Sequence, residues 1–143
     1  MTSYVLDASV AVKWYLAAQD EPLREQALLL ADRYAGGFIR FVVPDLFFAE
    51  VGNIFWKAER NGRCTPKLAA WAVDEILELR LDAVPSTKLL RDAVSIASKY
   101  ERSVYDSLYL ALAVSANVKF LTADERLVNA LRGEFPVTWL GAM

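Results

Sequence analysis

The chain has 143 residues, a formal net charge of −2, and a composition that is 55% hydrophobic and 24% charged. This length and this share of apolar residues predict one globular domain, residues 1–143, with a core large enough to need no disulfide. The sequence contains no histidine and one cysteine, Cys64. That composition excludes a Ser-His-Asp triad, a Cys-His pair, an imidazole zinc site and any multi-cysteine metal site.

With its net negative charge, the protein lacks the overall positive potential that attracts nucleic acids to basic proteins. The longest apolar stretch without a formal charge, residues 107–118, is well short of a membrane span. No signal peptide is visible, because the first three residues lead straight into a short apolar strand. We therefore expect a cytoplasmic protein, in a reducing setting, that makes no contact with a membrane.

Short apolar runs alternate with helical patterns along the chain. Strands are predicted at residues 4–6, 41–43, 81–84, 119–121 and 137–139. Helices are predicted at residues 10–16, 21–35, 45–60, 65–79, 88–100, 103–117 and 124–132. This alternation predicts an α/β fold, a three-layer α/β/α sandwich around a mostly parallel sheet of four or five strands. Ligands bind beyond the carboxyl ends of the strands in such sheets, so a functional site is expected there.

Most of the 18 acidic residues lie at helix starts or on solvated helix faces, but four lie in apolar surroundings. Asp7 and Asp124 follow short apolar strands, which places each at the carboxyl edge of the predicted sheet. Glu50 and Asp106 lie in helices that are apolar on most sides, where carboxylates are rarely buried without a partner. No compensating lysine or arginine is expected beside these four acids.

Each of the four acids also has a structural explanation. Ser103 and Asp106 form the pattern of a capping box, and so do Thr122 and Glu125. Asp7 suits a turn or a helix N-cap. Glu50 could emerge into solvent at the edge of its helix. Taken singly, each acid is therefore compatible with a structural role.

Taken together, the four acids indicate a site for a divalent cation. Two carboxylates about 4 Å apart repel each other by on the order of 4 kcal/mol at an effective dielectric constant of 20. A hard cation supplies the missing charge, and oxygen ligands without His or Cys favour Mg²⁺, with Mn²⁺ as the alternative. Such a site suits phosphodiester hydrolysis, because the metal activates a water molecule and stabilises the leaving oxygen. It also lets an acidic protein act on an anionic polymer.

At these positions the sequence resembles the PIN-domain family, specifically the VapC-type toxin ribonucleases of bacterial and archaeal toxin–antitoxin pairs. The matching stretches are Val5-Leu6-Asp7-Ala8-Ser9, Ala49-Glu50-Val51-Gly52-Asn53, Tyr105-Asp106-Ser107-Leu108-Tyr109-Leu110-Ala111 and Leu121-Thr122-Ala123-Asp124. Length, element order and motif order agree with this family from end to end.

The resemblance implies a Mg²⁺-dependent endoribonuclease, a hydrolase whose metal site is formed by Asp7, Glu50, Asp106 and Asp124. Of the adjacent acids Asp124 and Glu125, we favour Asp124 as the one that faces the metal. The resemblance further implies an RNA substrate, a homodimer, and a cognate antitoxin whose tail covers the active-site groove.

Further residues are candidates around this centre. Three polar residues are expected to orient the carboxylates or the metal-bound water: Ser9, Asn53 and Thr122. Three basic residues are the first candidates for contact with the RNA backbone, with simple solvation as the alternative: Lys13, Arg60 and Arg63. Six aromatic residues are candidates for a groove that holds the antitoxin tail, with ordinary core as the alternative: Trp14, Tyr15, Phe47, Phe48, Phe55 and Trp56.

Three other functions share parts of the pattern. A phosphoacceptor signalling domain would place paired acids after the first strand and another acid after the third, but Asp7 stands alone and the third strand runs into Pro85. A haloacid-dehalogenase-like phosphatase would carry Asp-x-Asp where this chain has Asp7-Ala8-Ser9. A catalytically silent PIN-like module, which acts only by binding its partner, would keep the fold without the chemistry.

Overall fold

Five parallel strands cross the centre of the protein in a computed structural model that describes residues 1–17, 19 and 21–143. They are β1 (Thr2–Leu6), β2 (Ile39–Pro44), β3 (Asp82–Val84), β4 (Lys119–Thr122) and β5 (Val137–Trp139). Their order in the sheet is β3-β2-β1-β4-β5, and every pairing is parallel. The register pairs Leu6 of β1 with Leu121 of β4, so these two strands end side by side.

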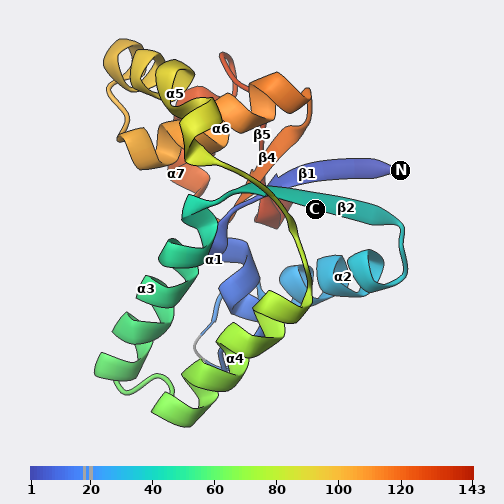
Figure 1. Ribbon diagram of the computed structural model, residues 1–143. Helices are drawn as coiled ribbons and strands as arrows, with labels where there is room; N and C mark the ends of the chain where they lie inside the picture. The colour runs from blue at the N-terminus through green and yellow to red at the C-terminus, as the bar shows by residue number, and fades with distance from the viewer. Residues whose placement is uncertain (18, 20) are drawn as a thin grey trace.

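Helices cover both faces of this sheet (Figure 1). The α-helices are α1 (Ala8–Ala11), α2 (Arg24–Ala35), α3 (Leu46–Arg60), α4 (Pro66–Glu78), α5 (Ser86–Tyr100), α6 (Val104–Ala116) and α7 (Glu125–Leu131), and the 3₁₀ turns are η1 (Val12–Trp14) and η2 (Leu140–Ala142). The group α1 to α4 packs against one face, and the group α5 to α7 packs against the other. This arrangement confirms the predicted three-layer sandwich.

The central strands are buried on both faces. Successive strand residues point to opposite faces of a sheet. Leu6 and Leu121 accordingly join the core beneath α1 to α4, whereas Val5 and Phe120 join the core beneath α5 to α7. None of the four side chains is more than 1% exposed. Because water reaches neither face, these strands form short continuous apolar runs in the sequence rather than alternating ones.

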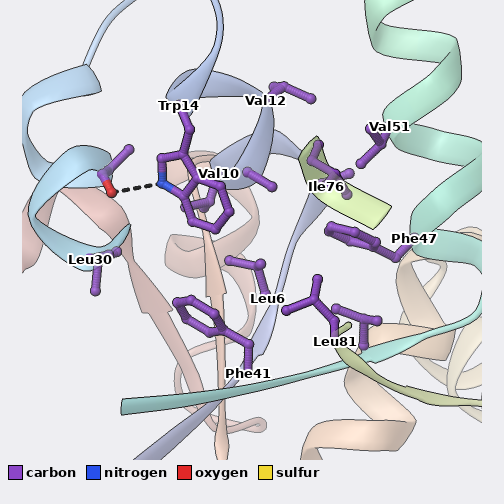
Figure 2. Packing of buried hydrophobic residues seen from close by; sticks show 14 of the residues in the cluster. Leu6, Val10, Val12, Trp14, Leu30, Phe41, Phe47, Val51, Ile76 and Leu81 are labelled. Atoms are coloured by element: carbon purple, nitrogen blue, oxygen red, sulfur yellow. Dashed lines mark hydrogen bonds between the residues drawn. The ribbon is translucent and has the colours of Figure 1, made fainter. Parts of the chain in front are cut away.

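The larger of the two cores lies between the sheet and the first four helices (Figure 2). Trp14 is 9% exposed in it, and its indole N–H donates to a backbone carbonyl of α2 at 2.7 Å. Phe47 and Phe55 are buried there as well, because the apolar stripe of α3 faces the sheet. These three residues are core, which is the second of the two alternatives given for them, and they do not line a partner groove. Tyr15 and Phe48 pack against the same core and are partly buried.

The first helical region differs from the prediction. The chain turns into α1 directly after Asp7, and a 3₁₀ turn then takes the place of the expected helix to residue 16. The helix predicted from residue 21 begins only at Arg24, because Leu23 adopts a φ of 60° in the left-handed region. In the part of the chain that the structure describes, no helix is long and apolar enough to span a membrane.

Candidate metal centre

Asp7 and Asp124 stand at the carboxyl ends of neighbouring strands. From β1 the chain adds β2 and then β3 toward one edge of the sheet, whereas β4 and then β5 are added toward the other edge. The direction in which strands are added therefore reverses between β1 and β4. A crevice opens at such a reversal, and α/β sheets bind their ligands there. The backbone N–H of Asp7 donates to the Leu121 carbonyl at 3.0 Å, which joins the end of β1 to the end of β4.

The carboxylate of Asp7 is held by two hydroxyl groups. Ser9 Oγ donates to Asp7 Oδ2 at 2.8 Å, and Thr122 Oγ1 donates to the same oxygen at 2.7 Å. The Thr122 side chain is fully buried, so water cannot compete for this bond. Together the two hydroxyls restrict the orientation of the Asp7 carboxylate.

The same two hydroxyls fasten the loop after β4. Ser9 Oγ accepts from the Ala123 backbone N–H at 3.1 Å, and Thr122 Oγ1 accepts from the Asp124 N–H at 3.1 Å. Asp124 itself is the N-cap of α7, because its Oδ1 accepts from the Leu127 N–H at 3.1 Å. The predicted capping box with Thr122 as its N-cap is therefore wrong, since the helix begins two residues later.

Glu50 and Asp106 approach this edge from helices on opposite faces of the sheet. Glu50 lies in α3, and its Oε1 atom is buried without a hydrogen-bond partner. Asp106 lies in the first turn of α6, where its backbone N–H donates to the Ser103 hydroxyl at 3.1 Å. The Ser103 cap that the sequence suggested is thus present. It uses the backbone of Asp106 and not its carboxylate, so the cap leaves that carboxylate available for another role.

The acids influence one another electrostatically. Burial raises the pKa of Asp7, its two hydroxyl partners lower it, and the charge of Asp106 raises it. Burial also raises the pKa of Glu50, and the charges of Asp7 and Asp106 raise it further. The pKa of Asp106 is raised by burial and by Asp124, although Arg102 lowers it. A cation therefore does stand near one acid, contrary to expectation, but the pKa values of all three acids remain raised.

Tyr109 is a residue of this centre that sequence analysis missed. Its side chain is 2% exposed, and burial together with the charges of Asp7 and Glu50 raises the pKa of the phenol far above its usual value. The hydroxyl lowers the pKa of Glu50, yet the geometry falls short of a regular hydrogen bond, so both oxygens lack a full partner. The available signal was its spacing, because Tyr109 lies three residues after Asp106 on one helix face.

Other candidates lie away from the centre. Asn53 is exposed on α3, and no hydrogen bond joins it to the acids within the described chain. Lys13 is 5% exposed, and its Nζ lies 2.6 Å from Glu21 Oε1, so both alternatives given for it, contact with RNA and simple solvation, are wrong. Arg63 donates to the other Glu21 oxygen at 2.7 Å. Arg60 lies on the outer face of α3.

The acid set fits a hydrated divalent cation. The candidate donors are carboxylate oxygens, burial and to a smaller extent neighbouring acids raise the pKa values of three of them, and a buried Glu50 oxygen lacks a partner. Among the residues that the structure describes, no group of three Asp, Glu or Cys side chains is close enough to hold an ion by itself. Mg²⁺ does not require such a cage, since it usually keeps several waters and takes one or two carboxylates from the protein.

The chain is similar to known proteins over most of its length. The model of the PIN domain family matches residues 4–131. Ribonuclease VapC3 from Pyrobaculum aerophilum is 30% identical to the chain over 127 residues, which is 87% of this chain and 92% of that protein.

Solved structures share the fold at low sequence identity. PAE2754 from Pyrobaculum aerophilum has a TM-score of 0.71 at 18% identity, over 99% of this chain and 91% of that one. VapBC2 from Rickettsia felis, bound to a DNA fragment from its promoter, has a TM-score of 0.64 at 14% identity, over 96% and 98% of the two chains. VapBC-1 from nontypeable Haemophilus influenzae has a TM-score of 0.62 at 15% identity, over 98% and 99%.

Proposed function

The chain belongs to the PIN domain family, and on that premise we propose that it is a metal-dependent endoribonuclease and the toxin of a toxin–antitoxin pair. The observation that carries the chemistry is the group of acids at the reversal of the strand order, where burial and neighbouring acids raise the pKa values of Asp7, Glu50 and Asp106. The relative that is named a ribonuclease, at 30% identity, supports RNA as the substrate.

Asp7, Glu50, Asp106 and Asp124 are the residues that would hold the cation, which we propose to be Mg²⁺ or Mn²⁺. When bound, the cation supplies the charge that activates a water molecule and stabilises the leaving oxygen of the phosphodiester. The pKa values of Asp7, Glu50 and Asp106, which burial and neighbouring acids raise, would fall beside a bound cation.

The protein's own contribution is orientation. The hydroxyls of Ser9 and Thr122 hold Asp7, and they hold the backbone that precedes α7, so Asp7 and Asp124 keep one relative position. The N-terminus of α6 adds a partial positive charge beside Asp106, which favours anions at this edge.

A surface for RNA extends along the outer face of α3. Trp56 is 51% exposed, and the Arg60 guanidinium lies 4.9 Å from the centroid of its ring. Lys57 is exposed beside them, and α3 also carries Glu50. An aromatic ring flanked by cations suits a single-stranded RNA, whose bases stack on aromatic side chains while its phosphates contact Lys and Arg.

We also propose a cognate antitoxin and a homodimer as partners. VapBC complexes are among the proteins that share this fold. An antitoxin that covers the acid edge would need to offset its negative charge, so we expect a basic side chain of the antitoxin to enter there.

The alternatives fit less well. A phosphoacceptor domain of the flavodoxin-like type has the strand order 2-1-3-4-5, whereas this sheet has the order β3-β2-β1-β4-β5. The third strand also ends at Val84 and leads into Pro85, with no acid at its end. A silent binding module has the same fold, so only an activity measurement separates it from the nuclease.

The test is cleavage of a single-stranded RNA by the purified protein with Mg²⁺, with Mn²⁺ and with EDTA. We expect cleavage that requires the cation and that Asp7→Asn abolishes. Asp74→Asn, which changes an exposed acid on α4, is the matched control and should cleave normally. A wild-type protein that binds an antitoxin but cleaves no RNA under any of these conditions would favour the silent binding module.

A further inference from the structure

We propose that Tyr109 is a positioning residue that acts through Glu50, with its buried hydroxyl holding the Glu50 carboxylate in the orientation in which it receives the divalent cation. This inference rests on the proposed function, and it assigns a role to a side chain in the second core of the protein.

The ring of Tyr109 has a defined position. It lies on α6 and stacks on Phe120 of β4, with 5.0 Å between the ring centroids and 21° between the ring planes. Both side chains are at most 2% exposed. A ring packed in this way between a helix and a strand cannot swing its hydroxyl far.

The Tyr109 hydroxyl is a polar group buried in an apolar core without a regular hydrogen-bond partner. Tyr109 Oη and Glu50 Oε1 are both buried and without a regular hydrogen-bond partner, and the two groups interact electrostatically. Buried polar atoms are nearly always satisfied, so two interacting groups whose buried oxygens both lack a regular partner require an explanation. A phenylalanine would pack in the same place without that penalty.

The chemistry allows one role for the phenol. The neighbouring carboxylates Asp7 and Glu50 oppose its ionisation, so it remains a neutral hydrogen-bond donor. Glu50, in turn, is an acceptor whose remaining oxygen is free for a cation. A hydrogen bond from the phenol would set the rotation of the Glu50 carboxylate, since an outer partner of this kind orients the ligand that it contacts.

A second hydroxyl on α6 provides the matched control. Ser107 Oγ is likewise buried without a partner, and its side chain is 0% exposed. Residues two apart on a helix do not share a face, so Ser107 does not point where Tyr109 points. If a buried, unsatisfied hydroxyl matters only for stability, Tyr109→Phe and Ser107→Ala should behave alike.

The experiment measures Mn²⁺ binding to the metal-free protein by calorimetry, with the electron paramagnetic resonance spectrum of the bound ion and thermal melts alongside. We expect Tyr109→Phe to weaken Mn²⁺ binding about tenfold and to alter the spectrum, with an unchanged or higher melting temperature. Ser107→Ala should leave binding and spectrum unchanged. Tyr109→Phe that binds Mn²⁺ as the wild type does would overturn the inference.

A double variant separates action through Glu50 from a general loss of structure. If Tyr109 acts through Glu50, adding Tyr109→Phe to Glu50→Gln should weaken Mn²⁺ binding no further, whereas independent additive losses would overturn the inference. A wild-type protein that binds no Mn²⁺ would overturn the metal-dependent function itself, and this inference with it. The two failures are therefore distinguishable by the wild-type titration.

Discussion

Thr122 Oγ1 donates to Asp7 Oδ2 at 2.7 Å, and this bond joins two residues that lie 115 positions apart in the chain. It forms because β1 and β4 are neighbours in the sheet and end in the same register. A single hydroxyl thus links the pairing of β1 with β4 to the orientation of an acid at the candidate metal centre.

Replacing Thr122 by valine should disturb both stability and activity. The change keeps the shape of the side chain but removes a donor to a buried carboxylate, so the free energy of unfolding should fall by about 1–3 kcal/mol. RNA cleavage should fall as well. Urea denaturation and a cleavage assay measure the two effects. Thr138→Val on β5, where the structure shows no side-chain hydrogen bond, is the control, and equal effects at both positions would contradict the assignment.

Asp106→Asn should separate a functional acid from a helix cap. It should abolish cation-dependent cleavage, and because it removes repulsion it should leave the metal-free protein at least as stable. Ser103→Ala is the converse variant, since it removes the cap of α6 and should cost about 1 kcal/mol of stability while cleavage remains. Thermal melts beside cleavage rates distinguish the two. If Asp106→Asn cleaves normally, Asp106 is structural.

The metal-free protein should lose part of its stability as pH rises. The pKa values of Asp7, Glu50 and Asp106 are raised in the folded state, so the folded protein binds more protons than the unfolded chain above about pH 4. Below the pKa values of the unfolded chain, the three acids are protonated in both states and the folded protein has its full stability. That stability falls as pH rises through the pKa values of the folded state, because ionising these acids costs more free energy in the folded protein. Urea denaturation in EDTA between about pH 4 and about pH 7 should therefore show Asp7→Asn gaining stability relative to the wild type. A constant difference across this range would contradict the raised pKa of Asp7.

The buried ion pairs of Glu21 should matter more than a surface pair. Lys13 and Glu21 have side chains only 6% and 8% exposed, so Glu21→Gln leaves a buried ammonium uncompensated and should destabilise the protein by about 3 kcal/mol. Asp82→Asn breaks the exposed Arg40–Asp82 pair and should change stability by less than about 0.5 kcal/mol. Chemical denaturation measures both values.

The Glu21 ion pairs should also weaken in acid. Burial alone would raise the pKa of Glu21, but Lys13 and Arg63 lower it below its usual value. The stability that the ion pairs contribute is therefore lost as pH falls through the pKa of Glu21 in the folded state.

Trp56→Ala should weaken binding of single-stranded RNA about tenfold, because a stacked base contributes roughly 1–3 kcal/mol. The effect should fall on KM and on the affinity of an uncleaved RNA, with kcat little changed, since the ring lies outside the acid group. Trp71→Ala is the matched control, because Trp71 on α4 is 50% exposed against 51% for Trp56. Fluorescence anisotropy with a labelled RNA measures the affinity. If both variants bind RNA like the wild type but fail to bind an antitoxin, the face belongs to the protein partner.

Much of the fold could be predicted because its signals are local. The buried strands are continuous apolar runs, and Asp7 and Asp124 follow two of them directly. Their positions at the carboxyl edge needed no knowledge of distant contacts. The parallel sheet and the three layers followed from the alternation of strands and helices. The prediction erred at residues 21–23, where the left-handed φ of Leu23 depends on the packing of the following helix and not on residue preference.

The sequence by itself therefore determined the fold class and the family to which the chain belongs. Only the tertiary structure decided which side chains meet. Lys13 is buried because its ammonium group donates to Glu21 and to the carbonyl of Pro22. Tyr109 interacts with Glu50 although α6 and α3 cover opposite faces of the sheet. Periodicity reports which side of an element is buried, but the partner across the interface is set by the packing of elements distant in the chain.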